Sequence, residues 1–523
     1  MPHAPTIPLP EPLKQKIKDA LVALSLANLL FLRPTFDLLF DDDRFFNRLL
    51  VTNHDLLALF ANIFGAAALI WLGMRAVHRF RQPVIQLVLH LAFFSLLLIP
   101  ADFVRAKFYS IPDYLVLAFF RQPVVMLCLV VVLALVLWQH RRAAILVAGL
   151  LGVMSAFAFV IVIKIVLLAL GVTHLRQCES GTLAPLMAVR PGQPRVVWMI
   201  FDELDYRLVF EERTTGVALP EFDRLEKETL HATHAYSPGD GTQLSMPPAI
   251  LGVRAATAVN GCDLMVTPFD TGITTSFNGL PNVFSSAREL GFNTALVGWY
   301  LPYDRLLSGQ LNFCAWWPWM PYESARGENF ADSLHQQFMS LAWPFDVRLA
   351  FAELCHQSLQ AAVTVSTNQN YGLTLLHLPP PHRPGVYSAT QHRFSIRDTL
   401  FKMNGAQGYI NNLVLADDEL GQIRRAMEAA GQWDNTWIIV AADHSWRSSS
   451  GFDGKRDLRV PFLVKPPGPA ASDTVFAPQF NTVLTHDLIL AMLRGEVTNQ
   501  ENVADWLDAH RAGHDFIPGK MAE

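Results

Sequence analysis

Long apolar runs fill the first third of the chain. Five of them are separated only by short polar segments: Ala20–Leu32, Leu56–Met74, Val84–Ile99, Leu115–Trp138 and Ala143–Leu170. A helix that crosses a bilayer needs about 20 predominantly apolar residues. The pattern therefore predicts an N-terminal all-α transmembrane domain of about five helices over residues 1–175.

Basic residues in the short connections predict the orientation of these helices. They lie before the first stretch, after the second and after the fourth: Lys14, Lys16 and Lys18; Arg75, Arg79 and Arg81; Arg141 and Arg142. Short loops rich in Lys and Arg stay on the cytoplasmic side. With five crossings, the chain after the fifth helix lies on the periplasmic or extracytoplasmic side. We therefore expect a multi-pass protein of the cytoplasmic (inner) membrane.

Strands and amphipathic helices alternate after a linker that contains Pro and Gly, over residues 176–194. Apolar runs at residues 196–201, 294–297, 373–376, 437–441 and 460–464 have the length of buried strands, and residues 416–430 place apolar side chains on one helical face. This alternation is typical of an α/β sheet with helices on both faces. It predicts a second domain over residues 195–523.

Composition agrees with a membrane part joined to a soluble part. Hydrophobic residues make up 51% of the chain and charged residues 17%, against roughly 25% charged in ordinary soluble domains. The net charge of −5 leaves no basic excess to neutralise phosphates, so we expect no nucleic-acid partner.

Cysteines fit the same division. Cys128 lies in a membrane helix, whereas Cys178, Cys262, Cys314 and Cys355 all follow the last helix. Four cysteines in an oxidising compartment permit two disulfides with three possible pairings, and four unpaired thiols are the alternative.

Acidic residues and histidines follow three of the expected strands. Asp202-Glu203 ends the first, His377 follows the run at residues 373–376, and Asp443-His444 ends the run at 437–441. Open α/β sheets place their sites at the carboxyl ends of strands. Carboxylate and imidazole ligands suit zinc, with manganese as the alternative. The sequence therefore predicts a divalent metal site, with the choice between Asp202 and Glu203 open.

The segment SPGDGTQLSMPPAILG, from Ser237 to Gly252, supplies a nucleophile. Glycines before Thr242 allow an unusual backbone, and the residues after it can begin a helix. A hydroxyl at a helix N-terminus faces unpaired N–H groups that favour a phosphate. A nearby cation would lower the pKa of that hydroxyl. Ser245 is the rival nucleophile.

Four motifs resemble the alkaline phosphatase/sulfatase superfamily, and more closely its membrane-anchored branch of lipid A phosphoethanolamine transferases and lipoteichoic acid synthases. VVWMIFDELDYR resembles the first metal-binding strand, and GTQLSMPP resembles the nucleophile segment, with the nucleophile at Thr242. HLPPPHRP resembles the two-histidine pattern, here His377 and His382, and AADHSWR resembles the second metal-binding strand end, here Asp443 and His444. The resemblance implies five membrane helices followed by an exported sulfatase-like (alkaline phosphatase-like) α/β domain.

The sequence departs from the branch in two places. Ser445 stands where Gly usually follows Asp-His, and a histidine about a dozen residues further on is replaced by Lys455 and Arg456. The sulfatase signature Cys/Ser-x-Pro-x-Arg is absent, which argues against a formylglycine sulfatase. The departures bear on the substrate more than on the metal.

The resemblance implies a metal-dependent transfer of a phosphoethanolamine- or phosphoglycerol-like head group from a membrane lipid donor to a cell-envelope glycan or lipid acceptor. The expected site residues are, as catalytic groups, Thr242 and His382; as metal ligands, Asp202, Glu203, Thr242, Asp443 and His444; as substrate contacts, His377, Ser245, Lys455 and Arg456. The alternatives are a phosphodiester or sulfate-ester hydrolase of the same fold, and an inactive sulfatase-like scaffold of the envelope.

Overall fold

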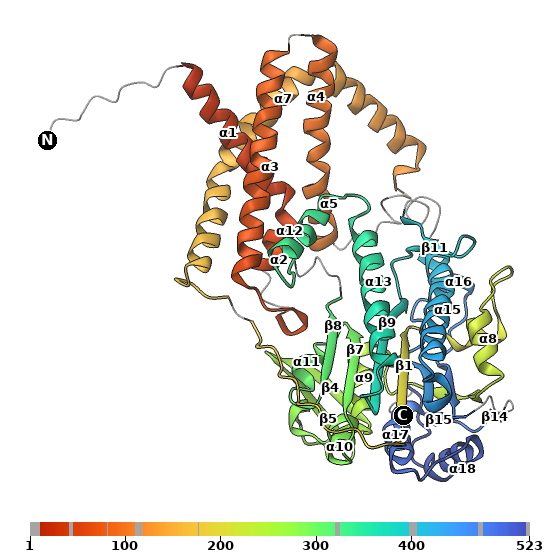
Figure 1. Ribbon diagram of the computed structural model, residues 1–523. Coiled ribbons are helices and arrows are strands. Elements are labelled where there is room, and N and C mark those ends of the chain that lie inside the picture. The colour runs from red at the N-terminus through yellow and green to blue at the C-terminus, as the bar shows by residue number, and fades with distance from the viewer. Residues whose placement is uncertain are drawn as a thin grey trace. The chain divides into compact units, whose positions relative to one another are not determined.

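The computed structural model describes residues 11–40, 45–80, 82–109, 116, 119–175, 177–319, 325–396, 405–468 and 474–518 (Figure 1). The chain forms two compact units. A helical unit comprises Met1–Asp43, Leu50–Arg176 and Pro321–Asp346, and a sheet-containing unit comprises Arg44–Leu49, Gln177–Met320 and Val347–Glu523. Each unit is described separately below.

The helical unit is built mainly from apolar helices. They are α1 (Glu11–Leu30), α2 (Leu32–Leu39), α3 (Asn53–Arg79), α4 (Pro83–Leu96), α5 (Leu98–Phe108), α7 (Pro123–Ala169) and the short α12 (Phe330–Met339). Within the described residues, three segments are long and apolar enough to cross a membrane, and a fourth is added if the bent pair α1 and α2 counts as one. The chain thus carries three or four candidate membrane helices, and the predicted number of five is not confirmed.

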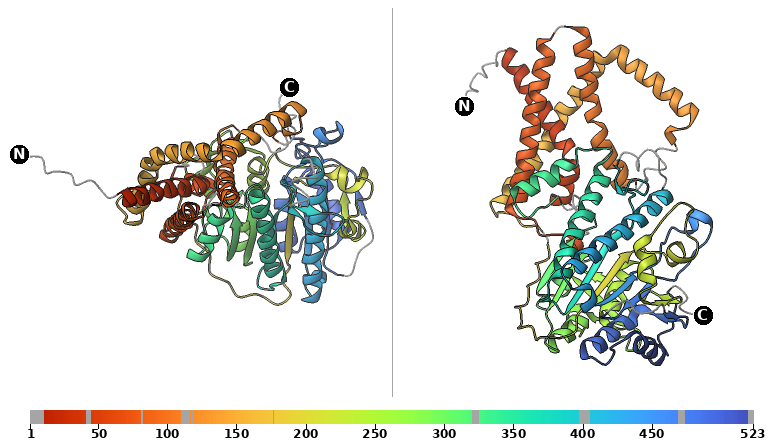
Figure 2. Two further views of the ribbon diagram at one scale, coloured as in Figure 1. Left: turned by 90° about the horizontal axis from the view of Figure 1, so that it is seen from above. Right: turned by 45° about the vertical axis from the view of Figure 1, so that its right-hand side comes forward.

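Helix α7 explains part of this difference. The predicted fourth and fifth helices are the two arms of a 47-residue helical segment, broken by non-helical backbone angles at Gln139 (φ −109°, ψ 20°). Residues 140–142, expected as a loop, are helical and directly follow this bend, from which the two arms of α7 diverge (Figure 2). At about 1.5 Å per residue, the helix is longer than the roughly 30 Å apolar thickness of a bilayer.

A late segment of the chain also belongs to the helical unit. Helix α12 packs against α3, where the buried carboxylate of Asp55 accepts hydrogen bonds from the Gly327 amide (3.1 Å) and the Ser333 hydroxyl (2.7 Å). Gln337 donates to the Asp55 carbonyl at 3.0 Å. The first turn of α3, which Thr52 caps through the same carboxylate at 2.8 Å, is thus also bound by residues 272–282 positions away, and no local pattern in the sequence indicates that contact.

The second unit is an α/β fold around a mixed sheet. Among the described residues the main sheet has eight strands in the order β14-β2-β13-β12-β1-β9-β7-β8. Their bounds are β14 (Thr474–Phe476), β2 (Leu230–Ala232), β13 (Phe462–Lys465), β12 (Trp437–Ala442), β1 (Val196–Asp202), β9 (Leu373–Pro381), β7 (Thr294–Trp299) and β8 (Phe313–Trp317). Strands β12, β1, β9, β7 and β8 run parallel, whereas β13 is antiparallel to both of its neighbours.

Helices pack against this sheet, with α15 on β9 and α17 on β1. The helices of the unit are α8 (Pro220–Glu226), α9 (Thr242–Leu251), α10 (Val283–Glu289), α11 (Tyr303–Leu306), α13 (Asp346–Thr367), α15 (Gly405–Ala429), α16 (Ser450–Asp453), α17 (Thr485–Arg494) and α18 (Gln500–His510). Smaller sheets are formed by β4 (Ala255–Asn260), β5 (Asp263–Pro268) and β6 (Thr275–Ser276), by β10 (Tyr387–Ser388) and β11 (Arg393–Phe394), and by β3 (Ala235–Tyr236) and β15 (Phe480–Asn481). The strands predicted at 196–201, 294–297, 373–376 and 437–441 and the helix at 416–430 are confirmed.

One of the two permitted disulfides is present. Cys178 and Cys262 are bonded, with their Cα atoms 5.4 Å apart. Cys314, Cys355 and Cys128 are unpaired thiols. The bond joins the segment before β1 to the turn between β4 and β5.

Candidate metal and nucleophile site

Three parallel strands end at one edge of the sheet and bring the predicted acids and histidines together. In β1, Phe201 pairs with Ala442 of β12, and Ile200 pairs with His377 of β9. Asp202 ends β1 and Asp443 follows β12 directly, so both carboxylates emerge beside His377. Ligand atoms of Asp202, His377 and Asp443 all lie within 4.8 Å of one another, and the three residues are buried. This group can hold a metal ion.

His444 turns its second ring nitrogen toward the same group. Its Nδ1 lies 3.0 Å from the Ser445 carbonyl oxygen, which can only accept, so Nδ1 carries a proton. The other nitrogen, Nε2, lies 3.4 Å from Asp443 Oδ2 and 3.7 Å from Asp202 Oδ1. When the ring is neutral, a lone pair on Nε2 faces two carboxylate oxygens.

Three buried atoms of this cluster make no hydrogen bond within the described part of the chain: Asp202 Oδ1, His377 Nε2 and His444 Nε2. Buried polar atoms are rarely left unsatisfied, because each costs about 1–3 kcal/mol. His377 Nδ1 lies 2.8 Å from the Tyr303 hydroxyl. In a metal-binding histidine, the second ring nitrogen usually donates to such a partner. If His377 Nδ1 does so here, all three unbonded atoms are acceptors. The donor set fits a divalent cation, which would satisfy all three.

Burial also makes two adjacent carboxylates costly. Burial first, and then the charge of Asp443, raises the pKa of Asp202 well above its usual value. Burial acts in the same direction on Asp443, but His444 and His377 outweigh it, so the pKa of Asp443 is lowered. One carboxyl group of the pair thus favours a proton in the protein alone. A cation would remove this penalty by compensating both charges.

Thr242 is the first residue of α9, and its hydroxyl points into the cluster. Thr242 Oγ1 donates to Asp443 Oδ2 at 2.8 Å and lies 3.4 Å from Asp202 Oδ2. Two glycines make this placement possible. A Cβ on Gly239 would lie 2.5 Å from the Leu244 carbonyl oxygen, and Gly252 ends α9 with φ +69°, where a Cβ would meet the His486 ring at 2.6 Å. The predicted nucleophile therefore lies within hydrogen-bond distance of the candidate metal group.

Glu203 occupies a different position from Asp202. It has a positive φ of 64°, its amide donates to Asp443 Oδ1 at 3.1 Å, and its carboxylate accepts a hydrogen bond from Arg447 Nε at 3.0 Å. The atom group that can hold a metal contains Asp202 and not Glu203. The sequence did not decide between the two acids. In the structure, Asp202 belongs to the cluster and Glu203 binds Arg447.

Arg447 lies beside the N-terminus of α9. A methyl group on Gly241 would be 3.7 Å from Arg447 Nη1, and the Arg447 side chain is about half exposed (46%). Its guanidinium is therefore available to a ligand that approaches Thr242. Because Glu203 neutralises part of its charge, Arg447 is oriented by one carboxylate while several of its donors face outward.

His382 lies among aromatic rings next to the cluster. The ring centroids of Trp319 and Trp299 are 4.7 and 5.3 Å from that of His382. His382 Nδ1 donates to the Arg383 carbonyl oxygen at 2.7 Å, so Nε2 bears the lone pair. Burial lowers the pKa of His382 to about 4, and burial likewise lowers the pKa of His377 to about 4. Both imidazoles are neutral near pH 7 and can accept a proton or bind a metal.

The remaining predicted residues lie further from this group. The Ser245 hydroxyl donates to the Gly241 carbonyl within α9 at 3.0 Å. Lys455 pairs with Glu212 at 2.6 Å, and its side chain is 57% exposed. Arg456 pairs with Asp240 at 2.7 Å and donates to the Arg447 carbonyl. It therefore stabilises the loop before Thr242. Ser245 and Lys455 therefore already have partners outside the cluster.

Three residues at the site carried no recognised signal in the sequence. Tyr303 bonds His377, the hydroxyl of Tyr409 donates to the Glu203 carbonyl at 2.6 Å, and Arg447 bonds Glu203. Tyr303 and Tyr409 come from helices far from the motifs in sequence. Arg447 lies within AADHSWR, three residues after His444, and its proximity to a strand-end motif was the available clue.

Comparison with known proteins identifies the family of the second unit. A family model described as Sulfatase matches residues 194–490, more than half of the chain. The chain therefore belongs to the sulfatase family, and the predicted resemblance to the alkaline phosphatase/sulfatase superfamily is confirmed. No curated protein matches the chain.

Several solved structures are similar to this chain at low identity. The sulfatase PsFucS1 from Pseudoalteromonas sp. is 15% identical, with 65% of this chain and 77% of that chain covered and a TM-score of 0.40. A phosphonate monoester hydrolase from Silicibacter pomeroyi is 14% identical, with 63% and 78% covered and a TM-score of 0.37. A protein of the alkaline phosphatase superfamily from Vibrio parahaemolyticus is 14% identical, with 60% and 69% covered and a TM-score of 0.39.

Proposed function

We propose that this sulfatase-family protein transfers a phospho-head group from a membrane lipid to a cell-envelope acceptor, with Thr242 as the nucleophile. The observation that carries the proposal is the placement of the Thr242 hydroxyl at the N-terminus of α9. It donates to Asp443 beside three buried acceptor atoms that make no hydrogen bond among the described residues. A hydroxyl in this position combines an anion-binding helix end with a metal group.

The proposed metal ligands are Asp202, His377, Asp443 and His444, with Thr242 as the fifth contact. Oxygen and imidazole donors suit zinc, and manganese is the alternative. A bound divalent cation lowers the pKa of a hydroxyl next to it and stabilises negative charge on phosphoryl oxygens. Glu203, also predicted from the sequence as a ligand, is held by Arg447, and its proposed role is to orient that arginine.

In the first step, the Thr242 oxygen attacks the phosphorus of the lipid phosphodiester. A bond forms between Thr242 Oγ1 and phosphorus, and the bond from phosphorus to the diacylglycerol oxygen breaks. The hydroxyl proton of Thr242 passes to Asp443 Oδ2, its hydrogen-bond partner at 2.8 Å, and the diacylglycerol oxygen takes up a proton as it leaves. The N–H groups at the start of α9 and the Arg447 guanidinium stabilise the phosphoryl oxygens, whose charge is spread out in the transition state.

In the second step, the acceptor oxygen attacks the phosphothreonine. His382 Nε2 can accept the proton of an acceptor hydroxyl, because its ring is neutral near pH 7. The bond between phosphorus and Thr242 Oγ1 breaks, and the threonine hydroxyl is restored. The departures at Lys455 and Arg456 leave phosphoethanolamine and phosphoglycerol as equal candidates for the transferred group.

The membrane helices support a lipid donor and an extracytoplasmic site. A chain anchored in the bilayer keeps a lipid substrate and the catalytic unit in the same small volume, which raises the effective concentration. Basic clusters mark one end of the helices as cytoplasmic by the positive-inside rule. The Cys178–Cys262 disulfide is typical of an oxidising compartment. We therefore propose that the second unit faces the cell envelope, where a glycan or lipid acceptor is available.

The test uses the purified full chain with membrane lipids labelled in the head group. Phosphatidylethanolamine and phosphatidylglycerol are offered separately, and the labelled peptide is identified by mass spectrometry. We expect the label on Thr242 in the wild type and in Ser245→Ala, and none in Thr242→Ala. Label that persists in Thr242→Ala but disappears in Ser245→Ala would overturn the choice of nucleophile.

The same experiment separates the alternatives. A hydrolase releases the labelled head group into water without an acceptor, whereas a transferase holds it on Thr242 until an envelope acceptor is added. An inactive scaffold shows neither label nor release, and contains no stoichiometric metal by elemental analysis.

A further inference from the structure

The helical unit contains a cavity that the proposed sulfatase-family chemistry does not use. A cavity of about 520 Å³ opens among α1, α3, α4 and α7, within the range of pockets that hold small ligands. Each helix contributes positions i, i+3, i+4 and i+7, as Gln15, Lys18, Asp19 and Val22 do on α1. Such positions share one helical face. The cavity is therefore lined by one face of each of the four helices and is partly open, since Ile145 in its lining is 69% exposed.

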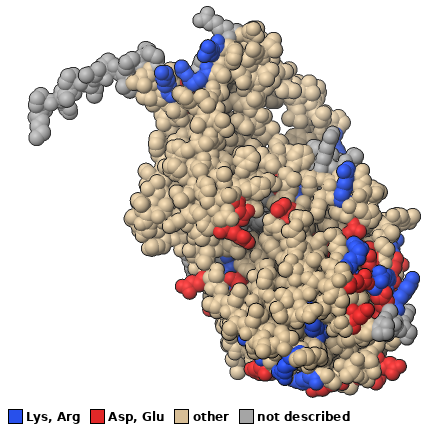
Figure 3. All heavy atoms as spheres, in the orientation of Figure 1, with Lys and Arg blue, Asp and Glu red and all other residues tan. Residues whose placement is uncertain are grey.

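The lining changes character from one end to the other. Lys18, Gln86 and Arg141 line one end, whereas Val22, Phe93 and further aliphatic side chains line the rest. The polar end involves the start of α1 and α4, the end of α3 and the bend of α7. Figure 3 shows Lys and Arg side chains gathered at the end of the unit where α1 begins. An apolar chamber thus has a basic mouth.

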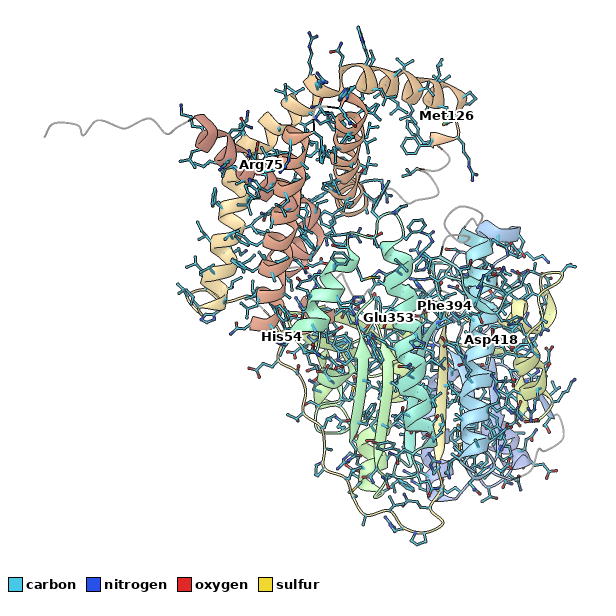
Figure 4. The ribbon with its side chains drawn as sticks, turned by 45° about the horizontal axis from the view of Figure 1, so that its top comes forward. His54, Arg75, Met126, Glu353, Phe394 and Asp418 are labelled. Atoms are coloured by element: carbon cyan, nitrogen blue, oxygen red, sulfur yellow. A yellow bond between two sulfur atoms is a disulfide. The ribbon has the colours of Figure 1, made fainter. Side chains whose placement is uncertain are left out.

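The charges at this mouth are not balanced. Asp19 interacts with Arg75 of α3, which is labelled in Figure 4, at 3.8 Å, and accepts a hydrogen bond from Gln15 at 2.7 Å. Among the described residues, neither Lys18 nor Arg141 has an ion pair with a carboxylate. Because Asp19 interacts with Arg75, the positive charges of Lys18 and Arg141 remain without a carboxylate partner in the part of the chain that the structure describes, and they can bind an anion.

We propose that this cavity binds one anionic phospholipid, with its phosphate between Lys18 and Arg141 and an acyl chain in the apolar part. Basic pockets between membrane helices suit anionic lipid head groups. The apolar lining argues for a lipid and against a free phosphate, which would leave most of the cavity empty. Because the basic mouth lies at the end opposite the expected extracytoplasmic side, this lipid is structural and distinct from a donor at Thr242.

Lipid retention by the detergent-solubilised full chain tests the proposal. Phosphatidylglycerol and phosphatidylcholine with identical acyl chains are added separately, and bound lipid is counted by native mass spectrometry. We expect one phosphatidylglycerol per chain, retained at least tenfold more strongly than phosphatidylcholine. Equal retention of the two lipids by the wild type would overturn the proposal without any variant.

Two variants separate the head-group contact from the chamber. Lys18→Gln with Arg141→Gln is expected to remove the preference, while Arg142→Gln, a neighbouring exposed arginine outside the cavity, retains it. Gly73 lines the cavity, and a Cβ there meets nothing within 4 Å. Gly73→Leu is therefore expected to fill the chamber and abolish retention of both lipids.

Gly65→Leu is the matched control on the same helix, since Gly65 also has open space around it and does not line the cavity. Lipid retention by Gly73→Leu at the wild-type level, or an equal loss in Arg142→Gln, would show that the lipid binds at the outer surface and would overturn the proposal.

Discussion

When its ring is neutral, the buried His444 side chain presents a lone pair on Nε2 to carboxylate oxygens of Asp443 and Asp202. The electrostatic repulsion among these acceptor atoms is unfavourable in the protein alone. A bound cation would attract each of them and make the interaction favourable. Asp202, Asp443 and His377 are buried beside His444, so these four residues form the candidate metal site. The hydroxyl of Thr242 then lies where the same charge would act on it.

Tyr303 orients one proposed ligand without contacting the metal. Removing the phenol oxygen in Tyr303→Phe leaves His377 Nδ1 without its partner at 2.8 Å. Loss of such an outer contact typically weakens metal affinity about 10–100-fold. We expect a loss of that size for zinc, measured by competition with a chelator of known affinity. Tyr371→Phe, on a tyrosine away from the cluster, should bind zinc as the wild type does.

Arg447 is the residue that most directly tests anion binding at the helix end. We expect Arg447→Ala to lower the labelling of Thr242 at limiting lipid about 10–100-fold, because hydrogen bonds to charged groups contribute about 1.5–3 kcal/mol. Higher lipid concentrations should restore part of the signal. Arg425→Ala removes another arginine that is paired with a glutamate, and unchanged labelling there would exclude a general charge effect.

The sequence predicted the residues of the cluster better than their roles. Asp202, Thr242, Asp443 and His444 are adjacent to strand ends or a glycine turn, so motif and position agree. His377 was expected to contact substrate, yet the parallel register of β1 and β9 places it beside Asp202. The choice between Asp202 and Glu203 depends on a backbone φ of 64° at Glu203, which residue type alone does not determine.

At the scale of elements, α8 is joined to α15 by one buried carboxylate. Asp417 of α15 accepts hydrogen bonds from the backbone amides of Glu221 (3.1 Å) and Phe222 (2.8 Å), which have no partner inside their own short helix. Burial nevertheless raises the pKa of Asp417 to about 7. The contact that positions α8 therefore carries an electrostatic cost.

This cost predicts a dependence of stability on pH. The folded protein binds the Asp417 proton up to about pH 7, whereas an unfolded chain releases it near pH 4, so the folded state holds more protons between those values. Stability from this group is therefore lost as pH rises through that window. We expect Asp417→Asn to gain thermal stability relative to the wild type between pH 5 and pH 8. A difference in midpoint that does not change with pH would contradict this.

Element boundaries were predicted well in the sheet and less well in the membrane part. Strands are short and end at chemically marked residues, whereas apolar helices can continue through a basic segment. The residues His140, Arg141 and Arg142 look like a loop in a hydropathy pattern, but all are compatible with helix, and α7 passes through them with one bend at Gln139.

At the scale of the whole molecule, the Cys178–Cys262 bond closes a loop across 84 residues. Removing a native disulfide typically costs about 2–5 kcal/mol. We expect the double substitution Cys178→Ser with Cys262→Ser to lower the unfolding midpoint of the full chain, measured by near-ultraviolet circular dichroism. Cys314→Ser, which removes an unpaired thiol, should have a smaller effect.

The same bond reports the side of the membrane. A membrane-impermeant reductant should make Cys178 and Cys262 reactive in sealed vesicles that expose the extracytoplasmic face. Vesicles of the opposite orientation should protect the bond. Reaction only in the second kind of vesicle would contradict the proposed orientation and the lipid-transfer function that depends on it.

Residues 321–346 belong to the helical unit although they follow most of the sheet in sequence. This matters when the two units are expressed as separate fragments. A fragment that stops at residue 176 loses α12, and the buried Asp55 carboxylate at the start of α3 then keeps Thr52 but lacks the Gly327 and Ser333 donors to its other oxygen. A fragment that begins at residue 177 contains α12 without α3, the helix on which it packs. The face of α12 that packs on α3 is then exposed and favours aggregation. Expression of either half alone is therefore a poor substitute for the intact polypeptide.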